Sequence, residues 1–302
     1  MAIPRDIVDW FRGVFADANR RLAEKMLNAP ATPEPTFDLT FIEHLTSFAA
    51  PRAFKSDWAI RIDTHYLGGL RHLERWEIAD IGVFVFFTKK GRMLRRKVAL
   101  LQSKRLFPRS ADVDHLDEYH IRLGMARIAA KDSDLASMMS ERVFAFSKFC
   151  KYQSLTKESD QAAAIDAHFE LHGIPIHYLF YNPPQLDLSV EVPLRDYVKL
   201  KEKDNHLGAR IIPFDAVHQA LTKKAASYSP SLGDTRKMLK GVEYGWRLEY
   251  FMADLLLGCK EGRRFQSNDE VPISELFYRR SGPISAAIAV TVEMPEDAEL
   301  PE

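Results

Sequence analysis

The 302-residue sequence has few cysteines, no excess of either charge and no long apolar run. Its two cysteines, Cys150 and Cys259, are too few for a disulfide framework and form no Cys-x-x-Cys pair, so we expect a reducing, cytoplasmic environment. No apolar run approaches the roughly 18 residues of a membrane-spanning helix. The 42 basic residues balance the 42 acidic ones, which excludes a globally cationic nucleic-acid binder. Any site for an anionic polymer must therefore be local.

Several catalytic signatures are also missing. There is no G-x-x-x-x-G-K-[ST] loop for nucleotide phosphates and no G-x-S-x-G nucleophile turn. His168 and His172 have the spacing of a zinc-protease helix, but Phe169 stands where that motif needs its glutamate. We therefore interpret this pair as a surface or helix-end feature.

The length is sufficient for one elaborated domain or two modest ones. Residues 1–27 form an amphipathic pattern, typical of a helix that packs on the body or lies on a membrane surface. Three prolines in residues 28–36 indicate a linker, which would make that helix an arm. Residues 186–293 are interpreted as an α/β extension of unknown role. The acidic tail, 294–302, is expected to be disordered.

Alternating helical and strand patterns predict an α/β sandwich around a mixed sheet flanked by helices. A nearly continuous apolar run at 78–88 predicts a strand buried on both faces, followed by a polar turn at 89–97 and a second strand at 98–106. Further helices are predicted at 40–49, 114–131, 134–147, 160–172, 215–224 and 246–258, and further strands at 174–181 and 209–212.

Polar residues gather where these two strands would meet. Asp80 opens the first strand, and Gln102, Ser103 and Lys104 close the second. An antiparallel hairpin centred at Gly91 places Asp80 opposite position 102, and a centre between 92 and 93 places it opposite position 105. In either register Asp80 lies beside the tripeptide, in which Gln102 and Lys104 share a face.

This grouping suits hydrolysis of a phosphodiester. The reaction needs a divalent cation that neutralises phosphate charge and activates water. Mg²⁺ prefers hard oxygen ligands, which Asp80 and the Ser103 carbonyl would supply. Lys104 would orient the attacking water or stabilise transition-state charge.

The pattern of Asp80, the two strands and Gln102-Ser103-Lys104 resembles the PD-(D/E)XK superfamily of restriction-endonuclease-like nucleases, in its D…QxK variant. The resemblance covers residues 37–185, about half the chain. It implies a mixed sheet flanked by helices, Mg²⁺ or Mn²⁺ as cofactor, Gln102 as a ligand in place of the second acid, and a role like that of bacterial antiphage defence effectors. The sequence departs from the common pattern in two ways: Ala79 replaces the proline before Asp80, and Gln102 brings no charge.

Two further acidic residues could compensate for the missing charge. The resemblance implies that an acid on the preceding helix joins the metal site, and Glu43 has that place. Thr40-x-x-Glu43 also fits a capping box, in which Glu43 only satisfies the Thr40 backbone N–H. Glu77 lies three residues before Asp80 and is either another metal ligand or an exposed residue.

The hairpin is strongly basic. No acidic residue occurs from Lys89 to Ala111, which favours a local surface that attracts phosphate over a solvated turn of mixed charge. The residues predicted to contact nucleic acid, besides Lys104, are Lys89, Lys90, Arg92, Arg95, Arg96, Lys97, Arg105 and Arg109.

Three hypotheses follow. The first is a Mg²⁺-dependent nuclease, an endonuclease with DNA as the expected substrate, acting alone, as a homo-oligomer or with a defence-system partner. The second is a non-catalytic nucleic-acid-binding or assembly subunit with a nuclease-like fold, which Gln102 keeps open. The third is an unrelated α/β protein with a coincidental hairpin. Metal-dependent cleavage separates the first from the others.

Overall fold

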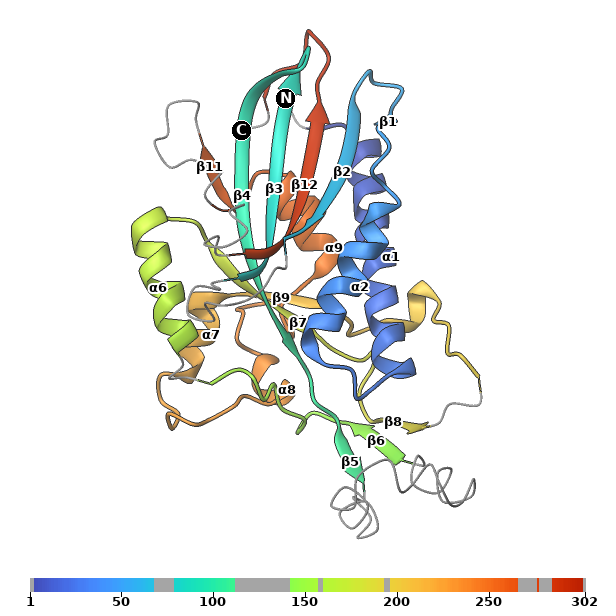
Figure 1. Cartoon of the computed structure of the whole chain (residues 1–302), viewed down its shortest axis with the longest axis vertical. Helices are drawn as coiled ribbons and strands as arrows, with labels where there is room; N and C mark the ends of the chain where they lie inside the picture. Colours follow the sequence, from blue (N-terminus) through green and yellow to red (C-terminus); the bar gives the residue numbers. More distant parts are fainter. Residues whose placement is uncertain are drawn as a thin grey trace.

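The computed structural model describes residues 3–67, 79–111, 142–156, 160–192, 196–265, 276 and 284–300. They form a mixed α/β protein, in which one nine-stranded mixed sheet is accompanied by a separate three-stranded sheet (Figure 1). The strand order of the large sheet is β1-β2-β12-β3-β4-β7-β9-β10, and β11 also pairs with β4. The small sheet has the order β5-β6-β8.

The strands of the large sheet are β1 (Arg52–Ala53), β2 (Ala59–Tyr66), β3 (Ala79–Lys89), β4 (Arg92–Arg105), β7 (Ile176–Tyr181), β9 (Arg210–Pro213), β10 (Trp246–Arg247), β11 (Arg263–Phe265) and β12 (Ile284–Glu293). Those of the small sheet are β5 (Arg109–Ala111), β6 (Arg142–Phe146) and β8 (Leu188–Val192). The helices are α1 (Arg5–Asn28), α2 (Glu34–Thr46), α6 (Asp160–His172), α7 (Phe214–Leu221), α8 (Leu232–Thr235) and α9 (Leu248–Tyr250); α9 continues as a π-helical segment, Phe251–Leu257, and Glu202–Asp204 forms a 3₁₀ turn.

The predicted hairpin is present as β3 and β4. Ile81 pairs with Leu101, so Asp80 comes opposite Gln102, the first of the two registers considered. The turn is tighter than predicted because Lys90 and Gly91 both have positive φ, which suits a two-residue turn between twisted strands. Residues 92–97 therefore belong to β4 and extend its ladder with β3.

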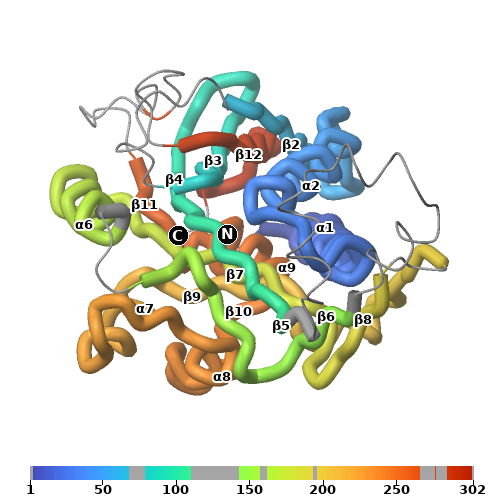
Figure 2. The backbone as a smooth tube through the Cα atoms, turned by 60° about the horizontal axis from the view of Figure 1, so that its bottom comes forward, coloured from blue at the N-terminus to red at the C-terminus, as the bar shows by residue number. Residues whose placement is uncertain are grey.

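The N-terminal helix is not an arm. α1 packs against α2 and against the α9 segment, and Figures 1 and 2 show α1 and α2 side by side. The apolar surface of α1 is wide enough to pack against both elements. Ile7, Phe11 and Phe15 on this surface are all buried. Burial against two partners keeps the helix within the body, although a proline-rich segment follows it.

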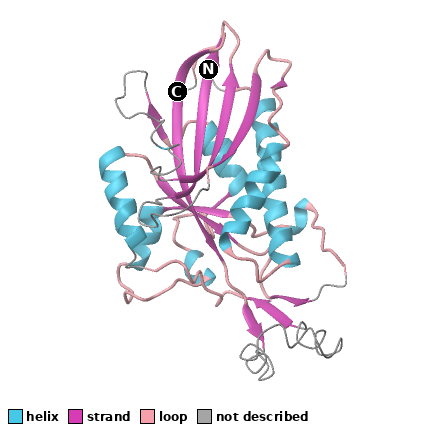
Figure 3. Cartoon of the chain, in the orientation of Figure 1, coloured by secondary structure: helices cyan, strands magenta, loops and turns pink. Residues whose placement is uncertain are grey.

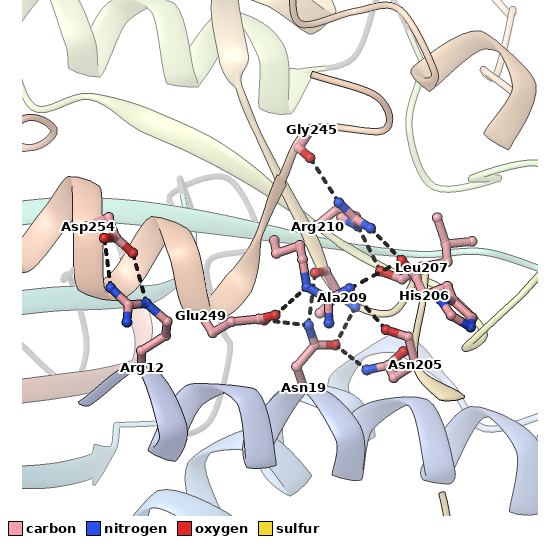
Figure 4. Close-up of polar contacts among 11 residues, drawn as sticks. Arg12, Asn19, Asn205, His206, Leu207, Ala209, Arg210, Gly245, Glu249 and Asp254 are labelled. Atoms are coloured by element: carbon pink, nitrogen blue, oxygen red, sulfur yellow. Dashed lines mark hydrogen bonds and ion pairs between the residues drawn. The ribbon is translucent and has the colours of Figure 1, made fainter. Parts of the chain in front are cut away.

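Figure 4 shows a buried polar network that joins α1 to the second half of the chain. The Asn19 amide donates to Glu249 Oε2 at 2.8 Å, and its oxygen accepts from the Ala209 N–H at 2.7 Å. The Asn205 side-chain amide donates to the same oxygen at 3.1 Å. Nearer the helix start, Arg12 forms an ion pair with Asp254 at 2.9 Å. These hydrogen bonds and the ion pair fix the orientation of α1 about its own axis. Apolar contacts alone would define that orientation less precisely.

Residues 186–293 are not a separate extension. β12 is inserted between β2 and β3, antiparallel to the first and parallel to the second, and β9, β10 and β11 join the same sheet. The apolar sequence of β12 explains this, because a strand buried on both faces must lie within the sheet. The boundary predicted at residue 185 therefore cuts through one core.

The acidic tail makes ordered contacts as far as residue 300. The Met294 N–H donates to the Thr88 carbonyl at 2.8 Å, and Lys89 Nζ donates to the Ala298 carbonyl at 3.2 Å. Lys90 forms an ion pair with Glu296 at 2.6 Å. The tail is ordered because the end of β12 carries it directly to a basic hairpin tip.

Three of the predicted helices are confirmed wholly or in large part. α6 matches 160–172, α7 covers most of 215–224, and the segment 246–258 is helical from Leu248 (Figure 3). The predicted helix 134–147 is wrong over Arg142–Phe146, which is strand β6. Its remainder and the predicted helix 114–131 lie outside the described residues. Within the described part of the chain, no helix is both long and apolar enough to cross a membrane.

Candidate active site

Asp80 lies near the start of β3, at the open end of the hairpin. It contacts two residues of the predicted tripeptide. Its Oδ2 accepts a hydrogen bond from the Ser103 backbone N–H at 2.7 Å and another from the Gln102 side-chain amide. This confirms that the hairpin brings Asp80 to Gln102 and Ser103. The contact follows from the register, because residues opposite each other in an antiparallel ladder lie close enough for short side chains to meet.

A second carboxylate, that of Asp38 on α2, completes the group. Asp38 Oδ1 accepts hydrogen bonds from the Tyr181 hydroxyl at 2.6 Å and from the Ser103 hydroxyl. Tyr181 is the last residue of β7, the parallel neighbour of β4. Burial, followed by the nearby charge of Asp80, raises the pKa of Asp38 well above its ordinary value, although the two donated hydrogen bonds oppose the shift.

Lys104 is held by Glu34, the first residue of α2. Lys104 is only 3% exposed, and its Nζ lies 3.5 Å from Glu34 Oε1. The other oxygen, Glu34 Oε2, accepts from the Arg105 backbone N–H at 2.7 Å and from the Ser154 hydroxyl at 3.0 Å. The ammonium is therefore held by Glu34, which lies one turn before Asp38 on α2.

Sequence reasoning missed Glu34 because it placed residues 28–36 in a linker, and it missed Asp38 because it began the next helix at residue 40. Pro33 and Pro35 suggested a break, but proline fits the first turn of a helix, where its missing N–H leaves no hydrogen bond unmade. Glu34 and Asp38 are spaced i, i+4, and an acidic pair at that spacing after a proline was the available signal.

Glu43 takes neither of its two predicted roles. Thr40 lies inside α2, where its hydroxyl donates to the Thr36 carbonyl at 2.8 Å, so Thr40 is not an N-cap and no capping box forms. The Glu43 side chain is exposed. Five residues of helix rotate it by roughly 140° from Asp38, away from the site. Glu77 lies outside the described residues.

The oxygen atoms at this site are of the type that a hard divalent cation binds. Asp80 and Asp38 offer two carboxylates. The buried Gln102 Oε1 has no hydrogen-bond partner within the part of the chain that the structure describes, which leaves an amide oxygen available as a ligand. Ser103, predicted to lend its carbonyl, contacts Asp80 through its N–H. Among the described residues, no three His, Cys, Asp or Glu side chains are grouped to hold a metal ion. An ion bound here would therefore take two acids, one amide and water.

The predicted nucleic-acid-binding residues do not form one surface. Ten residues of β4 separate Arg92 from Gln102, about 33 Å of extended strand, so the basic hairpin tip lies far from the site (Figure 1). Lys89 and Lys90 hold the acidic tail. Arg92 and Arg109 are exposed, and Arg95 and Arg96 are half-buried.

Two of these cations are wholly internal. Lys97 is 0% exposed, and its Nζ donates to the Leu256 carbonyl at 2.8 Å. Arg105 is 1% exposed, and its guanidinium donates to the carbonyls of Pro30, at 2.5 Å, and Thr32. Both were predicted to bind phosphate, and both instead donate hydrogen bonds to main-chain carbonyls. Charge alone could not reveal this, because residues 97–105 of β4 are buried on both faces by the elements that pack on the strand.

Lys97 predicts a distinctive pH dependence of stability. Burial lowers the pKa of Lys97 from 10.5 to about 8. Between these values the unfolded chain holds a proton that the folded chain has released, so the free energy of unfolding rises with pH. From pH 7.5 to 9.5 we expect a gain of about 2 kcal/mol in urea unfolding. The variant Lys97→Met should lose most of this gain, and parallel curves for the two proteins would contradict the assignment.

No protein-family model matches this chain, and no curated protein or solved structure does so either.

Proposed function

We propose that this protein is a Mg²⁺- or Mn²⁺-dependent nuclease, with DNA as substrate and its centre at Asp80, Asp38, Gln102 and Lys104. The observation that supports it most lies at the open end of the β3–β4 hairpin. Two carboxylates gather there with an amide oxygen that has no hydrogen-bond partner in the described part of the chain, and Lys104 follows on the same strand. A restriction-endonuclease-like fold is part of the proposal, supported by the antiparallel pairing of β3 with β4 and the parallel pairing of β4 with β7. A role in antiphage defence rests on the resemblance alone.

Each residue has a distinct part in this proposal. Asp80 and Asp38 would hold the cation, with Gln102 Oε1 as the neutral ligand. The bound ion supplies charge neutralisation at the phosphate and a more acidic water. Lys104 would donate to a phosphate oxygen as negative charge grows in the transition state. Glu34 keeps the ammonium in place until substrate competes for it.

A non-catalytic nucleic-acid-binding subunit is the second candidate. Two observations favour it: Gln102 brings no charge to the cluster, and Lys104 is buried in an ion pair with Glu34. This candidate predicts binding that weakens with salt and no cleavage with either metal.

The test is cleavage of supercoiled and linear DNA with Mg²⁺ or Mn²⁺ by the wild type, Asp80→Asn and Lys104→Met. We expect nicking that requires metal in the wild type and is lost in both variants. Exposed Arg92→Ala is the matched control and should cleave as the wild type does. Equal cleavage by all four proteins would indicate a contaminant and overturn the assignment of this site.

A further inference from the structure

An exposed surface of aromatic and basic side chains adjoins the candidate site. It comprises Arg109 at the start of β5, Lys148, Phe149 and Lys151 in the segment after β6, and Lys224 and Tyr228 between α7 and α8, and it is called here the aromatic–basic surface. Figures 1 and 2 place β5, β6 and α8 at the end of the molecule toward which β4 runs.

Phe149 is the most exposed ring of this surface. Its side chain is 57% exposed, an unusual position for phenylalanine. The Arg109 guanidinium carbon lies 5.8 Å from the ring centre, and Lys148 Nζ lies 5.1 Å from it. Both cations lie over the ring, which still leaves more than half of the residue exposed. A planar group can stack on the exposed part of the ring while the cations meet its negative charge.

The turn that carries Phe149 is held by its own hydrogen bonds. The Cys150 N–H donates to the Ser147 carbonyl at 3.1 Å, and the Phe149 N–H donates to the Ser147 hydroxyl at 3.3 Å. Cys150 is buried directly after the exposed ring. The ring is thus presented outward by a fixed backbone, which lowers the entropy lost when a ligand binds.

Tyr228 repeats the arrangement a short distance away. Lys224 Nζ lies 4.9 Å from its ring centre, and Lys151 Nζ lies 6.0 Å from it. The Tyr228 hydroxyl donates to Asp234 Oδ2 at 2.6 Å, which holds the ring in place. Asp234 Oδ2 also accepts a hydrogen bond from the Ser231 N–H at 2.8 Å.

The surface is continuous with the candidate site through two direct contacts. The Phe107 N–H donates to the Lys151 carbonyl at 3.0 Å, and Phe107 is three residues, about 10 Å, beyond Lys104 along the chain. The Ser154 hydroxyl donates to Glu34, which is paired with Lys104. One short segment, 147–154, therefore reaches from the exposed ring to the proposed centre.

We propose that the aromatic–basic surface binds a single strand of nucleic acid and leads it to the site at Asp80 and Lys104. Stacking on Phe149 needs an unpaired base, because the faces of bases in a duplex are already covered by their neighbours. Aromatic rings interleaved with cations are the general means of holding single strands without sequence preference. The direction of the strand toward the site rests on the proposed nuclease function, whereas the binding itself does not.

The experiment measures binding of the intact chain in EDTA, so that no metal-dependent cleavage occurs. Fluorescence anisotropy is recorded with a labelled oligo-dT of about 20 nucleotides, with oligo-U, and with a duplex of equal length. We expect the single strands to bind more tightly than the duplex, and Phe149→Ala to weaken single-strand binding by about 10-fold. Replacing Lys148 and Lys151 together with alanine should lower the salt slope by about 1.4.

Phe169→Ala is the matched control, because Phe169 is 45% exposed on α6, outside this surface. It should bind as the wild type does. Equal affinity of Phe149→Ala and Phe169→Ala, a stronger affinity for duplex, or no binding by the wild type would each overturn the proposal.

The outcomes also separate this proposal from the nuclease assignment. Phe149-dependent binding by a wild type that never cleaves would support the surface and refute the nuclease. Metal-dependent cleavage, together with binding that does not depend on Phe149, would support the nuclease and refute the surface.

Discussion

Replacement of Asp38 by asparagine is expected to lower metal-dependent cleavage by about 100-fold or more, the size usual when one group that stabilises transition-state charge is lost. Asparagine keeps the shape of the side chain and an oxygen that can accept from Ser103 and Tyr181. It removes only the negative charge, which the proposed cation needs.

The same variant, Asp38→Asn, should lose activity without losing stability. Burial and the charge of Asp80 raise the pKa of Asp38, so the ionised form is unfavourable in the folded protein. Asp38→Asn should therefore unfold in urea at the same denaturant concentration as the wild type or at a higher one. Glu43→Gln, whose side chain is exposed on another face of α2, should match the wild type in both measurements. Full activity of Asp38→Asn would remove Asp38 from the centre.

Replacement of Arg105 by alanine is expected to lower the free energy of unfolding by about 4 kcal/mol. The guanidinium donates to the carbonyls of Pro30 and Thr32, and each buried acceptor left without a partner costs about 1–3 kcal/mol. The guanidinium carbon also lies 4.4 Å from the ring centre of Phe107 and 5.7 Å from that of Phe37, contacts that alanine loses.

Arg105→Lys distinguishes the geometry of the guanidinium from its charge. Lysine keeps the charge but lacks the planar group that reaches two carbonyls, so it should recover only part of the loss. Exposed Arg92→Ala is the control and should change stability by less than about 0.5 kcal/mol. Denaturant unfolding followed by circular dichroism measures all three. A loss below about 1 kcal/mol for Arg105→Ala, with weaker DNA binding, would restore the earlier assignment of Arg105 to phosphate.

The sequence by itself determined the part of the site that depends on local pairing. A continuous apolar run, a turn at Gly91 and a polar tripeptide were sufficient to place Asp80 beside Gln102 and Ser103. Strand register is a local property here, because the two-residue turn at Lys90 and Gly91 sets it. The amphipathic pattern of α7 is local in the same sense, since it repeats within a few residues.

Only the tertiary structure decided which other residues join that hairpin. Asp38 and Glu34 reach it because α2 packs across the end of β4, and Tyr181 reaches it because β7 runs parallel to β4. β12 lies beside β3 although more than 190 residues separate them in the chain. Long-range contacts of this kind depend on the burial of whole elements, and no local period records their partners. The inward or outward direction of each basic residue was decided in the same way, so charge along the sequence could not distinguish Lys97 and Arg105 from a surface for nucleic acid.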